Sequence, residues 1–246
     1  MLSISALEVA FQETTVLKGL SLSAAAGETV GIIGPNGSGK TTLFNCISGF
    51  AAQRSGTISL KDQEIQSLPP HERARKGLGR VFQNFGIFRQ MTLLENMLLA
   101  LESRPGEELS VSPWSSAARR RKEEAMERLR EIHLEAKALN KASSLSGGQM
   151  RLLEIMRTVA AGAEVFLLDE PTAGVSPRMK DDVTEIIRRL QALKKTVLII
   201  EHDITFIERF CGRIVVLNEG HVVLDDIPER VRADERLKEI YFGQGA

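Results

Sequence analysis

Residues 34–42 read Gly-Pro-Asn-Gly-Ser-Gly-Lys-Thr-Thr, a glycine-rich run that ends in a lysine and two threonines. Its glycines allow backbone N–H groups to curl around phosphate oxygens, in conformations where a Cβ atom would clash. Lys40 is placed to reach the terminal phosphates of a nucleoside triphosphate, and Thr41 is placed to bind Mg²⁺. The pattern therefore predicts a phosphate-binding loop, with nucleotide contacts expected from Gly34, Asn36, Gly37, Ser38, Gly39, Lys40, Thr41 and Thr42.

A plain hairpin turn is the alternative for this loop, because Asn36 followed by Gly37 is by itself a common turn signal. An apolar run at 29–33 precedes the loop, and a helical pattern at 43–47 follows it. Strand, loop and helix in this order are the context of a phosphate site, and the positive end of the helix dipole would face the nucleotide. We therefore favour nucleotide binding over a hairpin.

Two carboxylates follow a second apolar run at 165–168, where Asp169 precedes Glu170. In open α/β sheets ligands bind at the carboxyl ends of the strands, so these acids are expected to face the phosphate-binding loop. Asp169 would hold Mg²⁺ through its water shell, and Glu170 would polarise a water for attack on the γ-phosphate. Taken alone, the two acids could equally well cap the next helix.

His202 follows the next apolar strand, at 196–200, which brings it to the same edge of the sheet. A neutral imidazole there can hydrogen-bond the γ-phosphate and help to hold the attacking water. Gln83 ends a strand-like stretch at 79–82, but a lone glutamine in that place has no meaning of its own.

The run Ser146, Gly147, Gly148 and Gln149 stands directly before a long helical pattern. A hydroxyl group, free N–H groups and the helix dipole would make this a second anion-binding helix start, and an ordinary capped helix is the alternative. One compact chain gains little from a second phosphate-binding device on a separate lobe. Two chains packed head to tail would use it.

The elements that must position these residues alternate along the chain. Apolar patterns predict strands at 4–11, 20–23, 29–33, 57–60, 165–168 and 196–200, and helices at 41–49, 149–162 and 177–193. The continuous apolar runs are typical of strands covered on both faces of a parallel sheet, and the alternation predicts an α/β core. Residues 86–147 show helical periodicity at 93–101 and 116–132 without a strand, which predicts an inserted helical lobe, and a helix is expected at 228–243.

Composition argues against several classes of protein. The 246 residues carry 32 Lys and Arg against 32 Asp and Glu, so no overall field attracts nucleic acid, and the basic run at 119–124 is expected to be a solvated helix face. Cys46 and Cys211 lack metal-type spacing and indicate a reduced cytosolic chain. The first residues lack the features of a signal peptide, and the best apolar run, 197–200, is far short of the roughly 20 residues that cross a bilayer.

The order and spacing of these motifs resemble the nucleotide-binding subunit of an ABC transporter, and the match runs nearly from end to end. The resemblance implies a single ABC ATPase domain over 1–246, with a P-loop NTPase core and a mostly parallel sheet. It also implies an N-terminal antiparallel β subdomain and an inserted helical subdomain. The core would comprise 1–85 and 148–225, the helical subdomain 86–147 and the C-terminal tail 226–246.

The resemblance also implies that ATP and Mg²⁺ bind between two subunits. Each ATP would lie between the phosphate-binding loop of one subunit and the run 146–149, the signature, of the other. Gln83 would be a Mg²⁺ ligand beside Thr41 and Asp169, and a sensor that links the ATP site to the helical lobe. Phe11 stands where the family places an aromatic that stacks on adenine, with Val16 beside it, although a strand-end phenylalanine is more often a core residue.

One position departs from the family pattern. The family commonly has an aspartate in the dimer-contact loop, where this chain has Ser176. Ser176 cannot supply that charge, which calls coupling between subunits through this loop into question.

Local sequence narrows the choice of transporter. Residues 80–96, 44–50 and 240–243 resemble the importer subunits that serve branched-chain amino acids, and subunits that serve urea, short amides or lipopolysaccharide look much alike. We expect an ATP-hydrolysing subunit that energises an importer for branched-chain or other hydrophobic amino acids. A soluble ABC ATPase acting on nucleic acid is less favoured, because the chain shows no coiled-coil arms, zinc modules or second ATPase unit.

The expected partners are an identical chain or a sister ATPase subunit, together with integral membrane permease subunits. The chain itself would be cytoplasmic and peripheral on the inner face of the cell membrane, without inserting into it. Contact with the permease is expected in a groove beside Gln83, lined by Phe85, Ile87, Phe88 and Met91. Those four side chains could equally well form the helical lobe's own core.

Overall fold

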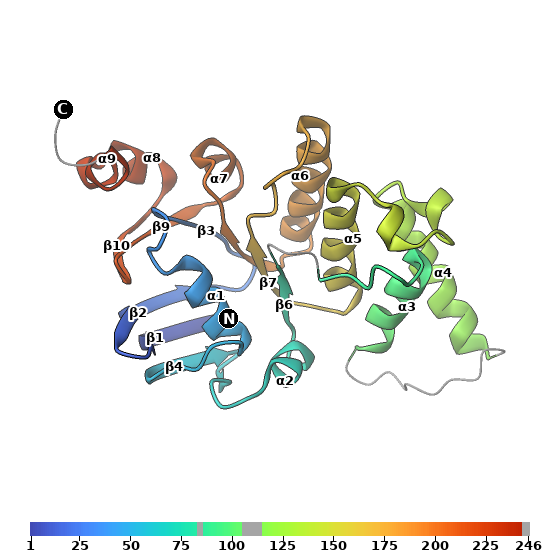
Figure 1. The fold of residues 1–246 in the computed structure, drawn as a ribbon, viewed down its shortest axis with the longest axis horizontal. Coiled ribbons are helices and arrows are strands. Elements are labelled where there is room, and N and C mark those ends of the chain that lie inside the picture. Colours follow the sequence, from blue (N-terminus) through green and yellow to red (C-terminus); the bar gives the residue numbers. More distant parts are fainter. Residues whose placement is uncertain (83–85, 105–114, 243–246) are drawn as a thin grey trace.

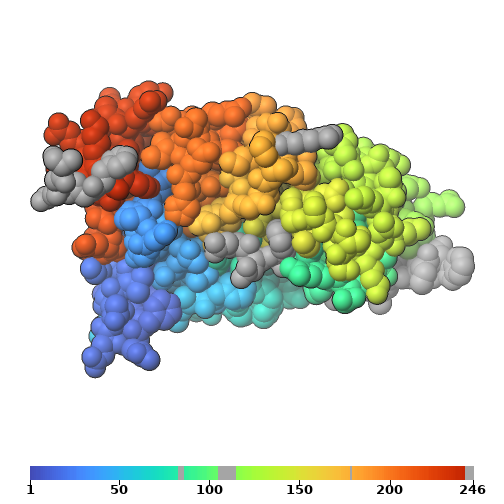
Figure 2. All heavy atoms as spheres, turned by 45° about the horizontal axis from the view of Figure 1, so that its top comes forward, coloured from blue at the N-terminus to red at the C-terminus, as the bar shows by residue number. Residues whose placement is uncertain are grey.

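The structure, a computed structural model, describes residues 1–82, 86–104 and 115–242. The molecule is elongated: the N-terminal sheet and the C-terminal helices lie at one end, and helices α3 and α4 lie at the other (Figures 1 and 2). The antiparallel sheet has the order β2-β1-β4-β5. Its strands are β1 (Leu2–Phe11), β2 (Thr14–Ala24), β4 (Ser55–Leu60) and β5 (Gln63–Glu64).

The second sheet has the order β10-β9-β3-β8-β7-β6. All neighbours in it are parallel except β10, which pairs antiparallel with β9. Its strands are β3 (Thr29–Ile33), β6 (Leu78–Val81), β7 (Val165–Asp169), β8 (Thr196–Ile200), β9 (Arg213–Asn218) and β10 (His221–Asp226). Because β6, β7, β8 and β3 run in the same direction, their carboxyl ends meet at one edge of the sheet.

Side chains of this sheet alternate between two hydrophobic clusters, one on each face. Val165 and Leu167 of β7 pack in one cluster with helix α1 (Lys40–Ser48) and the antiparallel sheet. Phe166 and Leu168 pack in the other cluster, with the helices on the opposite face: α5 (Gly147–Ala160), α6 (Pro177–Ala192) and α7 (Ile204–Phe210). Burial on both faces is why the strands read as continuous apolar runs.

The far end of the molecule is helical. Helix α3 (Leu93–Glu102) begins with a capping box in which Thr92 and Glu95 exchange hydrogen bonds, and α4 (Ser116–Arg130) packs beside it (Figure 1). Short 3₁₀ turns at Glu135–Lys137 and Ala142–Ser144 lead into α5. Arg104 at the end of α3 donates to both carboxylate oxygens of Glu124 on α4, at 3.2 and 2.8 Å.

The α/β architecture with a mostly parallel sheet, the N-terminal antiparallel sheet and the separate group of helices agree with the prediction. The tail differs: instead of one helix, the structure has α8 (Pro228–Ala233) and α9 (Glu235–Phe242). Asp234 between them has extended backbone, and its carboxylate accepts the N–H of Arg236 at 2.9 Å, as a turn residue does. Helix α2 (Pro70–Arg75), α7, β9 and β10 were not predicted.

Two other expectations can be compared with the structure. Cys46 and Cys211 are buried free thiols, and burial raises the pKa of Cys46 to about 11 and that of Cys211 to about 12. Contrary to expectation, the basic run at 119–124 is not exposed throughout, because Arg121 is buried and its Nη1 lies 3.9 Å from Oε1 of Glu102. No helix within the described residues is long and apolar enough to span a membrane.

Candidate active site

The predicted site residues follow neighbouring parallel strands at the point where each strand ends. The phosphate-binding loop follows β3, Asp169 is the last residue of β7 and His202 follows β8. Gln83 follows β6 and lies outside the described residues. Open α/β sheets bind ligands at this edge, so the topology brings the loop, the acids and the histidine to one place.

Two glycines give the phosphate-binding loop its shape. Gly39 has φ +105°, and a Cβ atom there would stand 2.7 Å from Cδ2 of Leu17. Gly34 has φ +153°, and a Cβ atom there would overlap the carbonyl oxygen of Leu217. Helix α1 begins directly after Gly39, and no described side chain caps its first N–H groups. These groups and the positive end of the helix dipole are available to an anion.

Polar side chains complete a cradle that fits phosphate. The Nζ atom of Lys40 is buried and donates to the carbonyl oxygens of Gly34 and Pro35, at 2.8 and 2.9 Å. The buried hydroxyl of Ser38 has no hydrogen-bond partner among the described residues. Burial lowers the pKa of Lys40, and the nearby carboxylates of Glu170 and Asp169 oppose this shift. A cation, a hydroxyl and free N–H groups at one helix start match a nucleotide's phosphates.

Asp169 is buried and held by a cation. Nη2 of Arg80, on the neighbouring strand β6, lies 3.1 Å from Oδ2 of Asp169. Burial raises the pKa of Asp169, while the guanidinium of Arg80 opposes that rise. Its other oxygen, Oδ1, accepts no hydrogen bond from the described residues. This oxygen is suited to accept a hydrogen bond from a water bound to Mg²⁺, and the hydroxyl of Thr41 is suited to bind the ion itself.

The described residues contain no group of three His, Cys, Asp or Glu side chains that could hold a metal ion by themselves.

Glu170 and His202 contact each other across the ends of β7 and β8. Nε2 of His202 lies 2.9 Å from Oε1 of Glu170, and the N–H of Glu170 donates to the carbonyl of Ile200 at 2.9 Å. Glu170 has φ +48°, a left-handed conformation that costs a non-glycine residue about 1 kcal/mol. Strained backbone of this kind clusters at functional sites. A carboxylate beside an imidazole can hold and polarise a water.

Glu201 is a site residue to which the sequence analysis gave no role. Its Oε1 accepts the N–H and the hydroxyl of Thr172, at 2.8 and 2.7 Å, and its Oε2 accepts the N–H of His202 at 3.3 Å. It therefore joins the loop after Glu170 to the end of β8. The signal was present, because Glu201 follows the apolar run 197–200 directly, as Asp169 follows the apolar run 165–168.

The signature residues start helix α5 and form a capping box. Oγ of Ser146 accepts the N–H of Gln149, and Oε1 of Gln149 accepts the N–H of Ser146, both at 3.3 Å. Lys137 donates to the same Oε1 at 3.2 Å. Gly148 allows α5 and α6 to approach, since a Cβ atom there would stand 2.8 Å from Cγ of Met179. A capped helix start is thus present, and contact of Ser146 and Gly147 with a partner's ATP stays a prediction.

The residues predicted for adenine binding and for the dimer-contact loop lie in different environments. Phe11 is 51% exposed, so it is not a core residue, and its stacking on adenine stays a prediction. Val16 is half-buried and borders the loop, with its carbonyl 3.5 Å from the Cβ position of Gly39. Ser176, which lacks the charge of the family aspartate, accepts the N–H of Met179 at 3.4 Å and caps α6.

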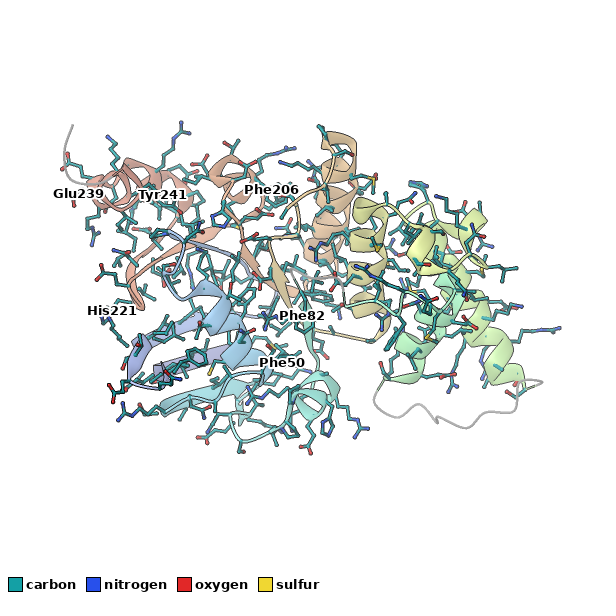
Figure 3. The ribbon with its side chains drawn as sticks, viewed as in Figure 1. Phe50, Phe82, Phe206, His221, Glu239 and Tyr241 are labelled. Carbon is teal, nitrogen blue, oxygen red and sulfur yellow. The ribbon has the colours of Figure 1, made fainter. Side chains whose placement is uncertain are left out.

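The predicted groove residues are divided between core and surface. Ile87 is buried in the hydrophobic cluster, and Met91 is partly buried. Phe88 is 49% exposed, and the guanidinium carbon of Arg157 lies 4.9 Å from its ring centre. Phe85 lies outside the described residues. Phe50, which the prediction did not include, is 59% exposed and meets Phe82 edge to face at 5.4 Å (Figure 3).

Comparison with known proteins gives matches over most or nearly all of the chain. A family model described as ABC transporter matches residues 17–173. The chain is 38% identical to the high-affinity branched-chain amino acid transport ATP-binding protein BraF of Pseudomonas aeruginosa, over 99% of this chain and 98% of the relative. It is 36% identical to the lipopolysaccharide export system ATP-binding protein LptB of Escherichia coli, over 96% of this chain and 94% of the relative.

Solved structures show the same fold. A nucleotide-free ATP-binding cassette from an ABC transporter superposes with a TM-score of 0.86 at 32% identity, and the match covers 99% of both chains. A dimeric ATP-binding cassette in a post-hydrolysis state, bound to ADP and Pi, has a TM-score of 0.81 at 28% identity, with 93% of this chain and 99% of the other covered.

Proposed function

The chain belongs to the ABC transporter family, as its ATP-hydrolysing subunit, and we propose that it energises an importer for branched-chain or other hydrophobic amino acids. The match to BraF over nearly the full length of both chains carries the choice of cargo. LptB is almost as similar, so lipopolysaccharide export is the second candidate. The ATPase reaction itself is supported by the contact between Glu170 and His202 at the edge of the sheet.

For hydrolysis, we assign binding to the phosphate-binding loop and proton transfer to Glu170. Lys40 would leave the carbonyl oxygens that it now contacts and bind the β- and γ-phosphates. Glu170 would take the proton of the attacking water, and His202 would hold that water and the γ-phosphate. A Mg²⁺ ion at Thr41 and Asp169, with Gln83, would neutralise the charge of the phosphates.

Assembly follows from the same assignment. We infer that the unit which hydrolyses ATP is a pair of subunits, identical or sister chains, in which residues 146–149 of one contact the ATP of the other. The dimeric relative bound to ADP and Pi supports a pair. Within each subunit we divide the chain into a core of 1–85 and 148–225, a helical subdomain of 86–147 and a tail of 226–246.

We propose that Phe50 and Phe88 contribute to the permease contact, because both large apolar side chains are about half exposed and Phe50 packs against Phe82, the residue after β6. The chain would then be a peripheral subunit on the inner face of the membrane. Pull-down with detergent-solubilised membranes should recover integral membrane subunits with the wild-type chain, and Phe50→Ala with Phe88→Ala should weaken that recovery. Recovery unchanged in the double variant would move the contact to another face.

The cargo is tested by transport in cells that lack this gene. We expect uptake of radiolabelled leucine to fall, and to be restored by the wild-type chain but not by Glu170→Gln. Glu219→Gln is the matched control, since Glu219 shares the left-handed φ of Glu170, +48°, but is exposed in the turn between β9 and β10. Normal leucine uptake with defective lipopolysaccharide at the cell surface would overturn the amino-acid proposal and favour export.

A further inference from the structure

Arg80 on β6 is a buried cation that joins three elements of the site. Its Nη1 donates to Oδ1 of Asn45 at 2.7 Å and to Oγ of Ser48 at 2.8 Å, both on α1. Its Nη2 donates to Oδ2 of Asp169 at 3.1 Å, at the end of β7. Only 6% of the Arg80 side chain and 3% of the Asp169 side chain are exposed to solvent.

Aromatic rings fix the plane of this guanidinium. Its central carbon lies 4.8 Å from the ring centre of Phe82 and 6.0 Å from that of Phe44. Phe82 in turn contacts the exposed ring of Phe50 (Figure 3). A guanidinium that lies over aromatic rings and donates three hydrogen bonds has few other orientations open to it. The direction of Nη2 towards Asp169 is therefore set by packing.

The arrangement is more specific than a stabilising ion pair requires. A buried pair can often be replaced by apolar residues without loss of stability, so its presence alone does not explain its retention. Here one oxygen of Asp169 is occupied by Arg80, while Oδ1 accepts no hydrogen bond from the described residues. The same cation donates two hydrogen bonds to α1, the helix that begins with Lys40 and Thr41. Arg80 thus links the two elements that would share a metal ion.

We propose that Arg80 is a positioning residue for the nucleotide-bound Mg²⁺: it holds Oδ2 of Asp169, leaves Oδ1 for the metal's water shell, and fixes Asp169 relative to Thr41. This inference depends on the proposed ATPase function. Outer residues that orient a metal-binding carboxylate typically contribute about 10- to 100-fold to metal affinity. Lysine cannot replace Arg80, because a single ammonium cannot present a planar fork to acceptors on both α1 and β7.

The test separates metal binding from nucleotide binding. Mn²⁺ is titrated into protein saturated with the non-hydrolysable analogue AMP-PNP and followed by electron paramagnetic resonance. Affinity for MANT-ATP is measured by fluorescence in EDTA. We expect Arg80→Lys and Arg80→Met to bind Mn²⁺ about tenfold more weakly or worse, with MANT-ATP affinity in EDTA within about twofold of wild type. Asn45→Ala keeps the pair with Asp169 but removes one tether, and should show a smaller loss.

Arg73→Lys is the matched control for a purely structural effect. Arg73 is also buried against α1, where it donates to the carbonyls of Cys46 and Ile47 at 2.6 and 2.8 Å, but it contacts no carboxylate among the described residues. It should lose stability and keep its affinity for Mn²⁺.

The proposal for Arg80 would be overturned by unchanged Mn²⁺ affinity in both Arg80→Lys and Arg80→Met, or by an equal loss in Arg73→Lys. A change in Arg80→Met alone would also overturn it, since charge and not geometry would then matter. Wild-type protein that binds neither MANT-ATP nor AMP-PNP would instead refute the proposed function, and the role of Arg80 with it.

Discussion

Replacement of Glu154 by glutamine is expected to lower the free energy of unfolding by about 3 kcal/mol. Glu154 lies on α5 and is 3% exposed. Its Oε1 accepts the N–H groups of Phe82 and Gly86, at 3.0 and 2.9 Å, and its Oε2 lies 2.9 Å from Nη1 of Arg151. One carboxylate thus holds both flanks of the segment that contains Gln83 and neutralises a buried cation.

The magnitude follows from what glutamine keeps and what it loses. Removal of one partner of a buried ion pair costs about 3–5 kcal/mol, because the other charge stays in a medium of low dielectric constant. Glutamine still offers one oxygen to the N–H groups of Phe82 and Gly86, so the lower end of that range applies. Each charge-assisted hydrogen bond then becomes a neutral one, which contributes about 1 kcal/mol. A total stability of about 5–15 kcal/mol leaves the variant folded.

Urea denaturation followed by circular dichroism at neutral pH measures this loss, with Glu127→Gln as the control. Glu127 and Arg130 form a pair of the same spacing on α4, at 2.7 Å, but their side chains are 60% and 56% exposed. Exposed pairs contribute about 0.5 kcal/mol or less, so the control should unfold almost as wild type does. A loss below about 1 kcal/mol in Glu154→Gln would refute the ionised pair. Burial raises the pKa of Glu154, while its hydrogen bonds to Gly86 and Phe82 and the charge of Arg151 oppose the rise, so a small loss would mean that burial outweighs these contacts.

Three further outcomes are expected. Glu170→Gln should bind ATP without turnover and accumulate an ATP-bound dimer in size-exclusion chromatography, and a monomer at saturating ATP and Mg²⁺ would contradict the two-subunit site. Glu201→Gln should lower ATP turnover about tenfold or more while ATP affinity is kept, because the loop at Thr172 loses its carboxylate anchor, and unchanged turnover would contradict that role. Gly19→Ala should lower the free energy of unfolding, measured by thermal denaturation, by about 1 kcal/mol, since φ is +70° but no atom lies within 4 Å of the new Cβ. Gly220→Ala should lower it clearly more, since its Cβ would overlap a backbone carbonyl. Equal losses in the two variants would argue against that overlap.

Sequence patterns located the buried strands better than the exposed ones. The predicted bounds 29–33 and 196–200 are those of β3 and β8, because both faces of these strands are covered. For β2 only 20–23 was predicted out of Thr14–Ala24, because the remaining side chains are mostly exposed or half-buried and the register with β1 shifts repeatedly. The hairpin of β9 and β10 was missed although its signal was present in the sequence: the apolar run 214–217 is followed by the turn residues Asn218 and Gly220.

The sequence predicted those site residues that lie at or just after the end of a strand. Asp169, Glu170 and His202 stand one or two residues after apolar runs, so their placement at the edge of the sheet needed only the parallel topology. Arg80 carries no such signal, because it lies within β6. Its proposed role depends on its contact with Asp169, which is 89 positions away along the chain. Pairings of this kind depend on strand order and side-chain packing, which no local pattern contains.

Two helices of this chain begin with the sequence of an anion site, but they treat their N–H groups differently. Helix α1 starts after Gly39, and no described side chain caps it. Helix α5 starts after Ser146, whose hydroxyl already accepts the N–H of Gln149 within a capping box. An anion at α1 therefore displaces no cap, whereas an anion at α5 must share the N–H groups with one. We infer that the nucleotide affinity of a single subunit depends on α1, and that α5 contributes only when a second subunit presents a phosphate that is already held.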